Sequence, residues 1–199
     1  MTLAGCTKAG DIMEGGISAV RSACPRVGVA AGTGDITLFN PAGSTDASAL
    51  DVTATMTNLQ STCNEAGEQI MTDVTFDVLA SRPQPGAARD VSLPYYIAIV
   101  RGGSSVTAKQ IGRVTVHFDS GQTRAQATGR ATSNIDRAAA TLPEETRKRL
   151  TERRKAGEDA AAIDPLADPA VRQAVLAASF EALVGFQLTE DQLRYNVTR

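Results

Sequence analysis

The chain has 199 residues, of which 42% are hydrophobic and 21% are charged. That length suits one domain with a substantial core, alone or with an appendage, and we take one domain as the simpler interpretation. The formal net charge is −2 and the two signs are interspersed, so no strong field favours a nucleic-acid partner. No run reaches the roughly 20 apolar residues that a membrane-spanning helix needs.

The N-terminus carries a candidate lipidation site. Leu3-Ala4-Gly5-Cys6 matches the lipobox of bacterial lipoproteins, in which small residues precede a Cys that receives a lipid thioether. A complete secretory signal peptide needs more residues before the box, so we interpret residues 1–23 as a truncated signal with its lipobox and a flexible, Gly-rich tether. Lipid on Cys6 would hold the protein at a membrane, because each buried methylene contributes about 0.8 kcal/mol. Thr7, in place of Asp, favours the outer membrane; the alternative is a chance match.

Alternation of apolar and polar residues predicts a series of β-strands over most of the remaining chain. The alternation is clearest from Ile70 to Ala80, which predicts a strand with one buried face. Residues 91–100 are apolar at nearly every position, so this strand should lie near the middle of a sheet. The predicted strands are about 27–39, 50–60, 68–81, 91–101, 104–111, 113–119 and 179–189.

Cys24 and Cys63 remain once Cys6 is assigned to lipid. An even pair in an oxidising compartment predicts a disulfide. Closing about 40 residues would stabilise the fold by about 4 kcal/mol in the chain-entropy model. A metal site is the weaker alternative, because it would need more ligands and His117 is the only histidine.

No set of residues in the sequence has the spacing of a catalytic site. His117 falls on the polar face of its strand, which predicts an exposed histidine with ordinary partners. Asp73 and Asp77 share one strand face, where solvated carboxylates are expected, and no Ser occupies a nucleophile elbow. Gly32-Thr33-Gly34 lacks the Lys and the following helix of a phosphate loop, so it predicts a turn. We therefore predict no catalysis, no cofactor and no metal.

The composition changes between residues 121 and 179, which we predict to be a helical insertion. Thr141 to Glu144 has capping-box spacing before a charged helix to Lys155, and Asp168-Pro169 predicts the start of a second helix. The part from Ala125 to Ala140 has little to bury, so the core should tolerate a shortened insertion. The basic residues Arg147, Lys148, Arg149, Arg153, Arg154 and Lys155 are interleaved with Glu, which favours a solvated helix over a lipid-binding one.

The C-terminal stretch returns to a strand and ends in a short helix. Phe180 to Leu188 alternates, and its buried face can only belong to the earlier sheets. Thr189 to Gln192 is a second capping box. The spacing of the strands predicts a mainly β domain over residues 24–199: an immunoglobulin-like antiparallel β-sandwich with the helical insertion before its last strand and a short C-terminal helix.

Several short motifs extend over most of the chain apart from the helical stretch. They are Leu3-Ala4-Gly5-Cys6, Cys24-Pro25-Arg26-Val27, Leu93 to Val100 with Ala108-Lys109, and Val184 to Thr189 with Gln192-Leu193 and Tyr195-Asn196. Together they resemble a family of uncharacterised alphaproteobacterial envelope (outer-membrane) lipoproteins. The resemblance implies an envelope address and the fold described above, and it implies no particular activity.

Two classes of function are consistent with these features. The first is a lipid-anchored, periplasm-facing structural or interaction module of the bacterial cell envelope, which would bind an envelope protein through a sheet edge or the insertion. The second is a carrier of a small apolar ligand between the two sheets, with Met56, Met71, Phe76 and Phe118 as its lining. A packed interior would favour the first class and an open apolar pocket the second.

Overall fold

The computed structural model describes residues 12–13, 16–17, 22–152 and 164–198, so the predicted lipidation site Cys6 lies outside the described residues. The strands are β1 (Ile12–Met13), β2 (Gly16–Ile17), β3 (Arg26–Val29), β4 (Asp35–Phe39), β5 (Leu50–Asn64), β6 (Gln69–Ser81), β7 (Arg89–Arg101), β8 (Ser105–Phe118), β9 (Arg124–Asp136) and β10 (Phe180–Phe186). The helices are η1 (Ala47–Ala49), α1 (Arg137–Ala140), α2 (Glu144–Thr151), η3 (Pro165–Ala167), α3 (Pro169–Ala177) and α4 (Glu190–Thr198).

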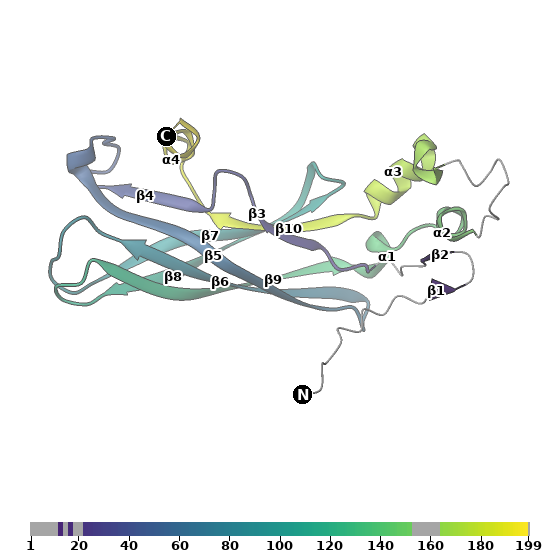
Figure 1. Cartoon of the computed structure of the whole chain (residues 1–199), viewed down its shortest axis with the longest axis horizontal. Coiled ribbons are helices and arrows are strands. Elements are labelled where there is room, and N and C mark those ends of the chain that lie inside the picture. The colour runs from purple at the N-terminus through teal and green to yellow at the C-terminus, as the bar shows by residue number, and fades with distance from the viewer. Residues whose placement is uncertain (1–11, 14–15, 18–21, 153–163, 199) are drawn as a thin grey trace.

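Eight of the described strands form two sheets of four that pack face to face in an elongated sandwich (Figure 1), and β1 and β2 pair with each other in a separate two-stranded sheet. We name each sheet after one of its edge strands: the β8 sheet has the order β3-β10-β7-β8, and the β9 sheet has the order β4-β5-β6-β9. Neighbours within both sheets are antiparallel, except that β3 runs parallel to β10. The predicted mainly β fold with two packed sheets is confirmed.

The first predicted strand, 27–39, is in fact two strands in different sheets. β3 pairs with β10 in the β8 sheet, and β4 pairs with β5 in the β9 sheet. The chain crosses between the sheets in a turn where Gly32 has φ +74°, a conformation that favours glycine. The predicted turn at Gly32-Thr33-Gly34 is therefore confirmed. It separates two strands of different sheets and does not lie within a single strand.

The predicted strands 104–111 and 113–119 form one continuous strand, β8. The break was expected at Gly112, but Gly112 pairs with Tyr95 in the middle of the β7–β8 ladder. A Cβ atom on Gly112 would lie 2.5 Å from Cζ of the Tyr95 ring. The glycine therefore makes room for an aromatic ring on the neighbouring strand and does not form a turn.

The prediction that the helical insertion begins near residue 121 is wrong, because Arg124–Asp136 is strand β9. It pairs with β6 along all of its 13 residues. Most of its inward positions hold small residues, so the hydrophobic alternation is faint, although Ala131 and Ile135 are buried. Gly129 faces Phe76, and a Cβ atom on Gly129 would collide with that ring. Removing the stretch 126–177 would delete most of β9, the edge strand that pairs with β6, so we now expect that deletion to destabilise the core.

The structure describes helices between β9 and β10 and another after β10, and their ends test three predictions. Asp168 caps α3 as predicted, because its carboxylate accepts a hydrogen bond from the N–H of Ala170 at 2.8 Å. The predicted capping box at Thr141 is wrong: Thr141 ends α1, and its hydroxyl donates to the carbonyl of Arg137. The box at α4 is confirmed, since Thr189 and Gln192 exchange hydrogen bonds of 2.9 and 3.3 Å.

The core lies between the two sheets and is built from their inward-facing side chains. Its largest fully buried members are Phe76, Phe118, Phe186, Ile36, Ile70 and Leu93. Three of the four residues proposed to line a ligand cavity, Met56, Phe76 and Phe118, belong to this packed core. The fourth, Met71, is 51% exposed, so it lies away from the other three. The four residues therefore do not form the wall of one cavity.

Candidate functional site

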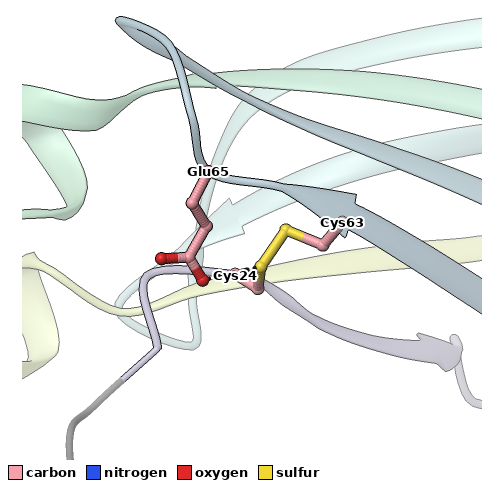
Figure 2. A group of neighbouring side chains, drawn as sticks. All are labelled: Cys24, Cys63 and Glu65. Carbon is pink, nitrogen blue, oxygen red and sulfur yellow. Dashed lines mark hydrogen bonds between the residues drawn. A yellow bond between two sulfur atoms is a disulfide. The ribbon is translucent and has the colours of Figure 1, made fainter.

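A disulfide joins the two sheets at the point where the chain enters the sandwich. Cys24 lies just before β3 of the β8 sheet, and Cys63 lies near the end of β5 in the β9 sheet. Their sulfurs are bonded, with 6.2 Å between the Cα atoms and a separation of 39 residues (Figure 2). The predicted pairing of Cys24 with Cys63 is confirmed.

Glu65 contacts this disulfide from the turn that follows β5. Its Oε1 lies 2.9 Å from Sγ of Cys24 (Figure 2). The carboxylate also accepts a hydrogen bond from the hydroxyl of Ser22. The Ser22 hydroxyl is the main reason that the pKa of Glu65 lies below its ordinary value, and the backbone N–H groups of Ala23 and Cys24 act in the same direction. A charged carboxylate therefore holds the two residues that precede Cys24.

The chemistry of this group depends on the redox state of its sulfurs. Ligand atoms of Cys24, Cys63 and Glu65 lie within 4.8 Å of one another, a spacing that a metal ion could bridge. Metal sites use thiolates, and sulfurs that are bonded to each other cannot supply them. For the same reason Sγ of Cys24 has no proton to donate to Glu65. In the oxidised state the arrangement is a covalent clamp with a carboxylate against it.

The sequence predicted the two cysteines of this site but not Glu65 or Ser22. Glu65 follows Cys63 by two residues, and nothing in the local pattern indicates that the turn folds back toward residue 24. The contact exists because β5 and β6 extend past β4 and bring their connecting turn close to the start of β3 (Figure 1). To predict the contact of Glu65 with Cys24 from the sequence, one would need to know how long the strands of both sheets are.

At the other end of the sandwich, Arg82 connects two loops. Its side chain is almost completely buried, with 7% exposed, and its guanidinium lies 5.1 Å from the centre of the Phe118 ring. It donates four hydrogen bonds of 2.7 to 3.1 Å to backbone carbonyls, whose residues are Gly86, Ala87, Asp119 and Gln122. The sequence placed Arg82 in a loop without indicating that the loop is organised around it.

The remaining candidate residues are engaged in pairs on the surface. His117 is exposed, and its Nδ1 lies 2.6 Å from Oδ1 of Asp90, which raises the pKa of the imidazole. The prediction of an exposed histidine with ordinary partners is confirmed. Asp73 pairs with Arg130 at 2.9 Å, and Asp77 accepts hydrogen bonds from two neighbouring strands.

Comparison with known protein families, with curated proteins and with solved structures finds no match for this chain. In the part of the chain that the structure describes, no helix is both long and apolar enough to cross a bilayer.

Proposed function

We propose that this chain is a lipid-anchored structural or interaction module of the bacterial cell envelope, without catalytic activity. Lipid on Cys6 would hold it at the outer membrane, and the sandwich would face the periplasm and bind an envelope protein. The lipobox Leu3-Ala4-Gly5-Cys6 supports the anchor, and the motifs that resemble envelope lipoproteins support the address.

The observation that carries the proposal is the position of the disulfide. Any pull on a lipid at Cys6 reaches β3 through Cys24, which lies two residues before that strand. β3 has four residues and makes one short parallel pairing with β10, so it would be a weak attachment by itself. The disulfide transfers the pull to β5, a strand of 15 residues that pairs on both sides. A protein tethered at this point and held by a partner elsewhere would need such a clamp.

The disulfide also supports a periplasmic location. Protein disulfides persist in oxidising compartments, of which the bacterial periplasm is one, and are rare in the cytosol. Cys63 is exposed, so a cytosolic reductant would have access to the bond.

The immunoglobulin-like classification of the sandwich stays a prediction. The face-to-face packing of two mostly antiparallel sheets supports it. The connectivity supports only the broader β-sandwich class, because β9 and β10 lie in different sheets. In immunoglobulin domains the last two strands are neighbours in one sheet.

The anchor can be tested by expressing the chain behind a complete lipoprotein signal and labelling cells with radioactive palmitate. We expect label on the protein and recovery in the outer-membrane fraction. Cys6→Ser should abolish both and release the protein into the periplasm, whereas Thr7→Ser, a matched change of the next residue, should alter neither. Label that survives Cys6→Ser would contradict the proposal.

A carrier of small apolar molecules is the second candidate, and one hollow favours it. The hollow has a volume of about 430 Å³ and lies between β4, the loop 42–45 and α4, with Leu38, Phe39 and Tyr195 in its lining. That volume is within the usual range for small-ligand sites. Saturable binding of an apolar fluorescent dye that Leu38→Glu abolishes, without loss of the fold, would favour this function.

A further inference from the structure

One half of β8 is exposed along its whole length. The seven consecutive residues 105–111 are exposed, and they include the large aliphatic side chains Val106 and Ile111, at 62% and 65%. β8 is an edge strand: within the described residues it pairs with β7 on one side, and no strand pairs with its other side. This half of β8 therefore offers both a free backbone edge and apolar side chains.

The face beside this edge is apolar. Ile111 lies opposite Tyr96 in the β7–β8 ladder, and Val106 lies opposite Val100. Lys109 lies between them in sequence, and its Nζ is 4.5 Å from the centre of the Tyr96 ring. The stem of Lys109 can cover part of this face while its charge stays at the rim. An added strand would extend an apolar surface that already spans β7 and β8.

The charge on β8 indicates what kind of strand could be added. β8 contains Lys109 and Arg113 and no acidic residue. Among the described residues no ion pair involves either side chain. Because side chains two apart share a strand face, Lys109, Ile111 and Arg113 present a cationic, apolar, cationic pattern. The complementary pattern on a neighbouring strand is acidic, apolar, acidic.

The same charges argue against a second copy of this chain as the occupant. An antiparallel pairing of two β8 strands centred on Ile111 would place Lys109 of each copy opposite Arg113 of the other. Like charges directly opposite each other across a ladder are destabilising. Charged residues on an open edge are a common means of preventing such self-association.

We propose that residues 105–113 of β8 bind an extended acidic segment of an envelope protein, which adds to the β8 sheet as a fifth strand. Its backbone would bond to the free edge of β8, its carboxylates would face Lys109 and Arg113, and its apolar side chains would pack beside Val106 and Ile111. This inference rests on the proposed role as an interaction module and names the site and chemistry of its partner.

The test uses the full chain, purified without lipid, and a fluorescently labelled peptide of sequence Thr-Glu-Thr-Val-Thr-Glu-Thr-Val-Thr. We expect the fluorescence anisotropy of the peptide to rise on binding, and a peptide with Lys in place of Glu to bind at least about tenfold more weakly. The double variant Lys109→Glu, Arg113→Glu should invert this preference. The matched control Arg124→Glu changes an exposed Arg on β9, an edge strand of the opposite sheet, and within the described residues no ion pair involves this Arg. It should leave the affinity of the acidic peptide unchanged within about twofold.

Two N-methylated versions of the acidic peptide test the strand geometry. In a β-strand, alternate backbone N–H groups point to opposite edges. The version methylated on the peptide edge that faces β8 should therefore lose binding, and the version methylated on the other edge should retain it. Equal binding of both versions, or of both charge types, would overturn the proposal. So would a dimer of the purified chain that Ile111→Glu dissociates, because a second copy would then occupy the edge. Palmitate labelling does not depend on β8, so it tests the anchor separately.

Discussion

The two ends of the sandwich are held together by different chemistry. At the tether end, which we define by Cys24 and Cys63 and which lies beside α1 to α3, a covalent bond connects the sheets (Figure 1). At the loop end, defined by residues 82–88 and 119–123, the buried guanidinium of Arg82 connects two loops through four carbonyls. Both devices act where strands end and the packing between sheets can no longer hold the chain.

The two ends of the sandwich differ in the force that each would have to withstand. The loop end connects two loops of the same domain, so hydrogen bonds around one buried guanidinium are sufficient. The tether end is where a pull from Cys6 would arrive, and hydrogen bonds can exchange with water one at a time under tension. A disulfide cannot open in that way, but it introduces a dependence on redox conditions. We therefore expect the tether end to respond to reductants and the loop end to respond to changes of the Arg82 side chain.

The largest effect should follow loss of the disulfide. Replacing both cysteines, Cys24→Ser with Cys63→Ser, should lower the free energy of unfolding by about 4 kcal/mol, because the unfolded chain would no longer be constrained by a 39-residue loop. Urea denaturation measures this loss. Hydrogen exchange should accelerate mainly in β3 and the start of β10, with the amides near Phe118 at the loop end less affected. An unchanged unfolding midpoint would contradict the clamp.

The second effect concerns Arg82. Arg82→Met should lower the free energy of unfolding by about 3 kcal/mol, because it removes four hydrogen bonds that a buried, charged donor makes to carbonyls on both loops. Arg82→Lys should recover only part of the loss, since an ammonium cannot reach carbonyls on both loops as the planar guanidinium does. Arg113→Met, on the exposed face of β8, is the matched control and should change stability by less than about 0.5 kcal/mol. Comparable losses for Arg82→Met and Arg113→Met would show that the network at Arg82 does not hold the loop end.

The sequence predicted those elements whose own residues determine them. β5, β6 and β10 alternate because their apolar side chains face the core, and most of β7 is apolar at nearly every position. α3 and α4 have polar caps within reach of their own first turns. The disulfide followed from counting cysteines. In each case the information lies within a few residues or in a small count.

The sequence did not predict elements whose residues are explained only by a neighbouring strand. The inward face of β9 is built from small residues because β6 supplies the bulk, so Gly129 has meaning only beside Phe76. Gly112 predicted a break because its partner Tyr95 is not visible in the local pattern. The division of the first strand between two sheets and the contact of Glu65 with Cys24 depend on how strands from different sheets end. Such features are properties of the assembled sandwich.

The smallest expected effect is on the rate at which the disulfide is reduced, and it follows from a change of Glu65. It best distinguishes the chemistry of the tether end from that of the loop end. A dithiol reductant such as dithiothreitol attacks the disulfide as a thiolate, and a carboxylate 2.9 Å from Sγ of Cys24 repels both that thiolate and the thiolate that leaves. We expect Glu65→Gln to accelerate reduction several-fold at low ionic strength. The acceleration should diminish in high salt, because salt screens exposed charges. The rate of thiol release measures it, and Glu68→Gln, an exposed carboxylate in the same turn, is the matched control.

The same carboxylate should give the tether end a dependence on pH. The pKa of Glu65 is lowered in the folded protein, chiefly by the Ser22 hydroxyl, so its charged form stabilises the fold. This contribution is present above the unfolded pKa of about 4.3 and is lost as the pH falls through the folded pKa. The difference in stability between the native chain and Glu65→Gln should therefore be seen at pH 7 and disappear at strongly acidic pH. An uncharged amide cannot repel a thiolate, so Glu65→Gln tests the repulsion directly. If the reduction rate at low salt is the same in Glu65→Gln as in the native chain, the carboxylate anchors residues 22–24 but does not protect the disulfide.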